Sequence, residues 1–170
     1  DGGRWALHPT PAPNGSGVAY VRFDGRSDSR LVLHTSAGER TLTRWNSLDP
    51  PAWIDDGALI LPQVEYVDTY RLYRDLFRVS LDGEVTRVTR GLRVVHVDFH
   101  PGKKEMVAVL ADGGANKLAL LSLNGEVIRI LQDAEPGVLW SSPACSPDGE
   151  RIAVVRRRPG GWTAVLVLDT

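Results

Sequence analysis

The chain has 170 residues, of which 42% are hydrophobic, so it is long enough to bury a core as one domain. Its formal net charge of −1 gives no overall reason to expect nucleic acid or an anionic membrane as a partner. The single cysteine, Cys145, excludes an internal disulfide framework and a multi-cysteine metal site, and no apolar run of about 18 residues offers a membrane span.

A turn pattern recurs four times along the chain. Its clearest copy, Ser142–Val155, predicts a short strand, a tight reversal at Pro147-Asp148-Gly149 and a second apolar strand, because Pro fixes φ and Gly tolerates a positive φ. The four copies start at Pro9, Pro51, Val97 and Pro143. The steps of 42, 46 and 46 residues between them are typical of propeller blades.

A second pattern keeps the same period. A Gly-Glu pair follows a short apolar strand at Gly38, Gly83 and Gly125, with spacings of 45 and 42 residues. Asp-Gly and Asn-Gly at two of these places suit the positive φ angles of a two-residue hairpin. Two independent markers with one period indicate a true repeat.

Each unit is expected to hold four short strands, which in the third unit span 95–100, 106–110, 118–123 and 127–131. The stretch 66–76 also fits a helical spacing, but we favour strand–loop–strand because 75–81 matches the third strand of the other units. The predicted fold class is therefore all-β, a β-propeller of about four four-stranded blades. The predicted blades are 9–50, 51–96, 97–142 and 143–170, with 1–8 as a candidate closing outer strand.

The two ends of the sequence bear on whether the four predicted blades form a closed propeller. Val165–Leu168 matches Leu120–Leu123, so the chain is expected to stop where a third strand turns into a fourth. Because it starts at Asp1 without a methionine, a processed product or an excerpt is expected. Four units could close alone, pair with a second copy as a homodimer, or form half of a longer propeller with missing blades, and we favour the last.

The Ser-Pro-Asp-Gly turn, the strand Glu150–Val155 after it, and Trp53 or Phe99 three residues before the turn resemble the TolB-like propeller repeat. This is one of the WD-like repeat families, but the Trp-Asp and Gly-His pairs of WD repeats are absent. The resemblance covers nearly the whole chain, and the departures are Pro11 and Cys145 at the aromatic position and Lys103 at a turn glycine.

The resemblance implies a bacterial protein in a periplasmic or secreted setting. Propellers of this family bind a protein or peptide, or serve as non-catalytic domains beside a peptidase or another enzyme. No partner-binding residue of the family can be transferred to this sequence by motif. Candidate sites therefore follow from the residue types and their spacing alone.

Three groups of residues are candidate sites. His96, Asp98 and His100 alternate on a predicted channel-lining strand, where they form a metal-site candidate or a polar wall. A loop rich in tyrosine and arginine is a partner-binding candidate, because these residues are enriched at binding hot spots: Tyr66, Asp68, Tyr70, Arg71, Tyr73 and Arg74. The equivalent loop of the last unit offers Arg156, Arg157 and Arg158, which could grip carboxylates or phosphates or form a solvated hairpin tip.

No catalytic motif is present in the sequence. Gly15-Ser16-Gly17 lacks the strand–elbow–helix context of a hydrolase serine, and Walker, dinucleotide-binding and His-Glu-x-x-His motifs are absent. We therefore expect a non-enzymatic scaffold that binds a protein or peptide and needs no cofactor. The first alternative is the accessory half of an enzyme such as a peptidase, and the second is a metal-dependent propeller enzyme that uses His96, Asp98 and His100.

Overall fold

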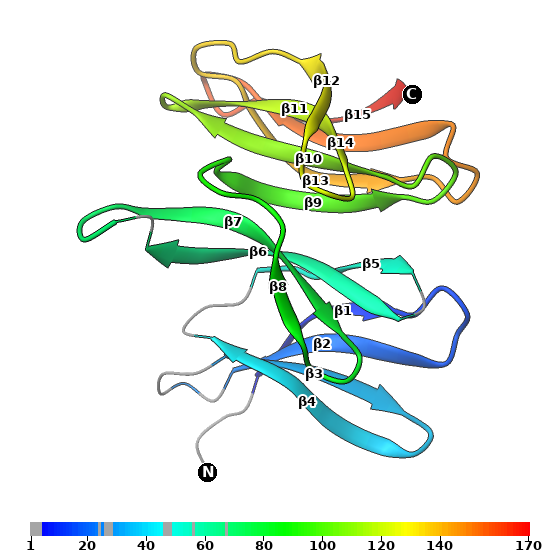
Figure 1. Cartoon of the computed structure of the whole chain (residues 1–170). Helices are drawn as coiled ribbons and strands as arrows, with labels where there is room; N and C mark the ends of the chain where they lie inside the picture. The colour runs from blue at the N-terminus through cyan, green and yellow to red at the C-terminus, as the bar shows by residue number, and fades with distance from the viewer. Residues whose placement is uncertain (1–4, 24, 26–28, 46–48, 56, 67) are drawn as a thin grey trace.

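The computed structural model describes residues 5–23, 25, 29–45, 49–55, 57–66 and 68–170. Within them, 15 strands form four antiparallel sheets. The described residues contain no helix, and hence none long and apolar enough to cross a membrane. The sheets stack in chain order as four blades, from blade A at the N-terminal end to blade D at the C-terminal end (Figure 1).

Each blade is a meander in which neighbouring strands in the chain are hydrogen-bonded neighbours in the sheet. Blade A contains β1 (Trp5–Pro11), β2 (Gly17–Phe23), β3 (Ser29–Thr35) and β4 (Gly38–Trp45). Blade B contains β5 (Ala52–Asp55), β6 (Ala58–Tyr66), β7 (Leu72–Ser80) and β8 (Val85–Arg87). Blade C contains β9 (Val94–His100), β10 (Glu105–Asp112), β11 (Ala115–Ser122) and β12 (Val127–Gln132). Blade D contains β13 (Leu139–Cys145), β14 (Arg151–Arg157) and β15 (Thr163–Asp169).

The predicted all-β propeller is confirmed, and so are the four strands of the third unit. The ambiguous stretch 66–76 is the end of β6, a tip and the start of β7, as the match to the other third strands predicted.

The predicted blade boundaries need correction. The boundaries at 96/97 and 142/143 fall inside β9 and β13, because the repeated turn pattern of blades C and D begins within the first strand and not at its start. The proposed closing strand 1–8 is also not found. Residues 5–8 belong to β1, which pairs with β2 inside blade A, while residues 1–4 lie outside the described part.

The repeated turn pattern has a common hydrogen-bonding basis. In blade D the Gly149 N–H donates to the Ser146 carbonyl over 2.9 Å, and Gly149 has a φ of +71°. The Asp148 carboxylate accepts from the Glu150 N–H at 3.0 Å, which fixes the start of β14. In blade C, where the aligned repeat has Lys103 in place of the turn glycine, the left-handed residue of the turn is Lys104, with a φ of +53°.

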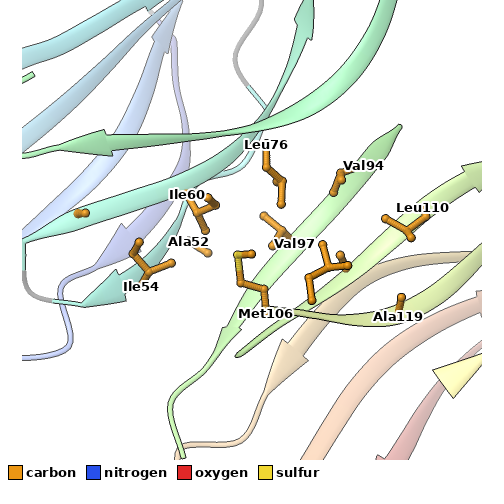
Figure 2. Close-up of a cluster of buried hydrophobic side chains, with 12 residues drawn as sticks. Ala52, Ile54, Ile60, Leu76, Val94, Val97, Met106, Leu110 and Ala119 are labelled. Carbon is orange, nitrogen blue, oxygen red and sulfur yellow. The ribbon is translucent and has the colours of Figure 1, made fainter. Parts of the chain in front are cut away.

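Apolar residues fill the space between successive blades. The B–C cluster brings Ile60 and Leu76 of blade B against Val97, Met106 and other residues of blade C (Figure 2). Equivalent clusters join blade A to blade B and blade C to blade D. Because successive side chains of a strand point to opposite faces, each central blade contributes to two cores, which explains its nearly continuous hydrophobic runs.

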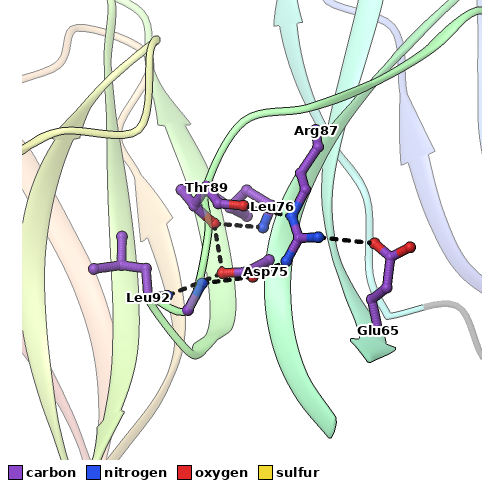
Figure 3. Close-up of polar contacts among 7 residues, drawn as sticks. Glu65, Asp75, Leu76, Arg87, Thr89 and Leu92 are labelled. Atoms are coloured by element: carbon purple, nitrogen blue, oxygen red, sulfur yellow. Dashed lines mark hydrogen bonds and ion pairs between the residues drawn. The ribbon is translucent and has the colours of Figure 1, made fainter. Parts of the chain in front are cut away.

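A buried carboxylate fastens β7 to the connection that leads into blade C. Asp75 is fully buried, and it accepts hydrogen bonds from Arg87 Nη2 at 2.6 Å and Thr89 Oγ1 at 2.9 Å (Figure 3). The N–H groups of Gly91 and Leu92 donate to the same carboxylate at 2.7 and 3.0 Å. The four donors satisfy the buried charge, so the 87–92 segment is held in place on blade B.

Candidate functional site

Both loops that the sequence selected lie on one side of the molecule. They are the hairpin tips between the second and third strands of blades B and D, and the corresponding tip of blade C extends to the same side (Figure 1). We call the surface formed by residues 66, 68–71, 113–114, 156 and 158–162 the tip face. Loops that project from a rigid sheet scaffold are common places for binding residues.

The blade B hairpin presents two exposed tyrosines on a braced turn. Asp68 Oδ1 accepts from the N–H groups of Tyr70 and Arg71, each at 3.0 Å, and Arg71 Nε donates to Asp68 Oδ2 at 2.6 Å. The arginine hydrogen bond lowers the pKa of the Asp68 carboxyl, so the brace is charged at neutral pH. Tyr70 is 92% exposed, and Tyr66, which lies opposite Leu72 in the β6–β7 ladder, is 66% exposed.

The other two residues selected in this loop are engaged within the protein. The Tyr73 hydroxyl accepts from Arg93 Nη2 at 2.8 Å, and the Arg93 guanidinium lies 4.2 Å from the centre of the Tyr73 ring. Arg74 Nε donates to Asp49 Oδ2 at 2.9 Å. The candidate loop therefore divides into a supporting part, made of Asp68, Arg71, Tyr73 and Arg74, and a presenting part, made of Tyr66 and Tyr70.

The arginine hairpin of blade D is divided between the two faces of its sheet. Arg156 lies opposite Trp140 in the β13–β14 ladder, with its guanidinium 5.9 Å from the centre of the Trp140 ring, and Arg157 alternates to the opposite face. Arg156 and Arg158 line a hollow of about 400 Å³ together with Trp162. Trp162 was not among the residues predicted from the sequence, although a tryptophan directly after Gly160-Gly161 at a hairpin tip was the available signal.

A channel lies where the inner strands of the four blades converge. A hollow of about 280 Å³ is lined by Thr10, Pro51, His96, Asp98 and Ser142, among others. Burial raises the pKa of the Asp98 carboxyl and lowers the pKa of the His96 imidazole, so both groups are pushed towards their neutral forms. Asp98 Oδ2 accepts from the Cys145 N–H at 2.7 Å, which ties the channel wall of blade C to blade D.

His100 does not join the other two members of the predicted metal set. It is fully buried under the turn of blade D, where a Cβ on Gly149 would lie 2.8 Å from His100 Cε1. Among the described residues, no three His, Cys, Asp or Glu side chains come together in a way that could hold a metal ion. Strand alternation alone suggested that His96, Asp98 and His100 would form one site, and the structure corrects this because blade D covers the end of β9.

No activated nucleophile is found in the described part of the chain. Among the described residues, no histidine is hydrogen-bonded to a hydroxyl or thiol group. Burial raises the pKa of the Cys145 thiol to about 12, so this cysteine is protonated at neutral pH.

Comparison with solved structures identifies the architecture. TolB from Acinetobacter baumannii superposes with a TM-score of 0.78 over 97% of this chain and 41% of its own, at 20% identity. A TolB of Agrobacterium tumefaciens gives a TM-score of 0.73 over 94% of this chain and 60% of its own, at 18% identity. The chain has the TolB-like β-propeller fold. A puromycin-hydrolysing peptidase of Mycobacterium tuberculosis also matches, with a TM-score of 0.68 at 15% identity over 98% of this chain and 28% of its own.

The TolB-like propeller of this chain spans less than two thirds of the length of the two TolB structures. No family profile and no curated protein matches it by sequence. The fold likeness also extends to a peptidase, so the TolB-like fold by itself is compatible with a binding protein and with a domain of an enzyme.

Proposed function

We propose that this TolB-like propeller is a non-catalytic scaffold that binds a protein or peptide partner through its tip face. The observation that carries the proposal is the pair Tyr66 and Tyr70, 66% and 92% exposed on a hairpin that Asp68 and Arg71 brace. Tyrosine supplies a large contact area with few rotatable bonds, and it is enriched at the centres of protein interfaces.

The brace supports binding because it removes part of the entropic cost of association. A free loop must be ordered when it binds, at about 0.5–1.5 kcal/mol for each immobilised side chain. Asp68 already fixes the backbone at Tyr70 and Arg71, and Arg93 fixes Tyr73 at the base of the tip. The hairpin can therefore present its two free tyrosines at a lower cost.

The proposal is tested by comparing the proteins that immobilised variants retain from a bacterial envelope extract. The wild-type chain is compared with a Tyr66→Ser/Tyr70→Ser double variant and with Ile128→Ser. Ile128 is a matched control because it is an exposed apolar residue of the outer strand β12. We expect at least one protein to be retained by the wild type and the control and lost from the double variant. Identical retention by all three would contradict the proposal.

A second candidate is an accessory propeller domain of a larger peptidase, with catalysis outside these residues. It is favoured by the likeness to the puromycin-hydrolysing peptidase, of which this chain matches 28%. The coding sequence on both sides discriminates the two functions, because an adjoining hydrolase domain supports the accessory role. A periplasmic or secreted bacterial location is part of the first proposal and rests on the TolB-like resemblance.

A further inference from the structure

The arginines of the blade D hairpin carry charge that the described part of the protein does not neutralise. Arg156, Arg157 and Arg158 follow one another, and none forms an ion pair with an acidic group among the described residues. By contrast, Arg22, Arg71, Arg74 and Arg87 each contact a carboxylate at 2.5–2.9 Å. The hairpin is therefore a positively charged surface that is open to an external anion.

Strand alternation places Arg156 and Arg158 at one hollow and Arg157 at a different one. Arg156 and Arg158 line the 400 Å³ hollow with Trp162, Pro159 and Ala164. Arg157 pairs with Leu139 in the ladder, so strand alternation turns it to the opposite face from Arg156. It lines a different hollow, which reaches His96 of blade C and shares Thr163 with the first. The cation pair and the aromatic ring consequently face one ligand position.

The hollow is held in shape by the connection between blades C and D. Pro159 packs so closely on Gly137 that a Cβ at Gly137 would lie 2.6 Å from Pro159 Cγ. The turn is closed by the Arg158 N–H, which donates to the Trp162 carbonyl at 2.8 Å. Trp162 nevertheless remains 79% exposed, so its indole face is available for contact.

We propose that this hollow binds an acidic peptide segment, with a carboxylate on Arg156 and Arg158 and a neighbouring apolar side chain on Trp162. The guanidinium fork matches a carboxylate in two parallel hydrogen bonds, and the indole supplies apolar contact area. The inference rests on the proposed binding role of the tip face and names the chemistry of a partner segment.

The surroundings favour a peptide over a nucleic acid. A nucleic-acid site needs several basic groups along the path of a phosphate backbone, with aromatic rings between them for the bases. Here the chain carries a net charge of −1, Arg157 is turned to the other face, and the hollow holds one aromatic ring. Two cations and one ring suit a single acidic side chain and its apolar neighbour.

Calorimetric titration of the full chain with a short peptide of alternating Glu and Leu tests the inference, with the Gln–Leu peptide as its uncharged counterpart. We expect the acidic peptide to bind and the Gln–Leu peptide not to bind. Arg156→Gln or Arg158→Gln should weaken binding about tenfold, because each removes a charge-assisted hydrogen bond. Arg157→Gln removes the same charge from the opposite face, so it should change the affinity by less than about twofold.

Three results would overturn the inference. The first is that the acidic peptide does not bind at concentrations up to about 1 mM. The second is that Arg157→Gln loses as much affinity for the peptide as Arg156→Gln or Arg158→Gln. The third is that an oligothymidylate of similar length binds more tightly and displaces the peptide. The Tyr66→Ser/Tyr70→Ser variant should bind the peptide like the wild type. A negative result for partner binding by the tyrosines can therefore be distinguished from a negative result for peptide binding in this hollow. Circular dichroism melting of each variant confirms that it is folded.

Discussion

At the scale of single residues, the protein separates buried charges that support the fold from exposed groups that are free to bind. Burial alone would raise the pKa of the Asp75 carboxyl, but the hydrogen bonds from Gly91, Arg87, Thr89 and Leu92 together lower it. A carboxyl whose pKa is lower in the folded state stabilises the fold above its unfolded pKa, near 4. That contribution is lost as the pH falls through the folded value.

Asp75→Asn should therefore destabilise the protein by about 3 kcal/mol at pH 7, because Arg87 loses its buried partner. At a pH below the folded pKa of Asp75, the wild type should lose this advantage and approach the variant. Urea unfolding curves at neutral and acidic pH measure both effects, and Glu126→Gln, at an exposed position, is the control. An equal difference in stability at both pH values would show that the charge of Asp75 is not responsible.

Cys145 offers a second residue-scale test. Because burial raises the pKa of its thiol to about 12, the reactive thiolate is scarce at pH 8. We expect iodoacetamide to label Cys145 more than about tenfold more slowly in the folded protein than in urea, since only the thiolate reacts. Mass spectrometry of timed samples measures the rates. Cys145 is half-buried beside the C–D core, and rapid labelling of the native protein would contradict its protonated state.

At the scale of elements, the turn after the first strand does more than reverse the chain. The Ala12–Gly15 and Ser146–Gly149 turns share the same hydrogen bond at 2.9 Å and the same glycine φ of +71°. They differ in their neighbours: a Cβ on Gly15 meets nothing within 4 Å, whereas a Cβ on Gly149 would collide with the buried ring of His100. The blade D turn thus also closes the end of blade C.

Gly15→Ala should lower the free energy of unfolding by about 1–2 kcal/mol, because a residue with a Cβ is strained in the left-handed conformation. Gly149→Ala should cost a further 1–3 kcal/mol or so, because it also overpacks the contact with His100. Urea unfolding of the double-mutant cycle should show that most of this additional loss of stability disappears when Gly149→Ala is made in the His100→Ala background. Equal costs for the two glycines would contradict the interlocking of blades C and D.

The sequence predicted those features of the elements that depend on local chemistry. The recurring turn pattern and the recurring Gly-Glu pair were enough to place the strands of blade C, and the match of 75–81 to other third strands placed β7. The burial of His100 and the pairing of Tyr73 with Arg93 depend on contacts between segments that are distant in sequence. The binding role of Tyr66 and Tyr70 stays a prediction, since their exposure shows only that they are available.

At the scale of the whole molecule, the two end blades present different outer faces. On blade D, Leu166 and Leu168 pack towards blade C, so Val165 and Val167 alternate outwards and are 69% and 62% exposed. On blade A, Ala19 and Val21 pack towards blade B, and the opposite face carries Arg22, whose guanidinium lies 2.6 Å from the Glu39 carboxylate. One end is therefore apolar and the other is polar.

We expect the apolar end to cause association that depends on protein concentration. Light scattering with size exclusion should show a mass above the 18.6 kDa of one chain at high concentration. Val165→Glu/Val167→Glu should restore the single-chain mass, while Ile128→Glu, on the outer strand of blade C, should not. A monomer at all concentrations would show that the outer face of blade D does not associate.

Attaching a bulky group at one position tests most directly whether partner binding uses the tip face and not another side of the propeller. Because the half-buried thiol of Cys145 has a pKa of about 12 and stays protonated, a bulky polyethylene glycol maleimide can be attached selectively at Tyr70→Cys, or at Ile128→Cys as the control. The measurement is the retention of partner proteins from the envelope extract by each conjugate. We expect the conjugate at position 70 to lose the partner and the conjugate at position 128 to keep it. Retention by the position 70 conjugate at the level of the control would contradict partner binding through the tip face.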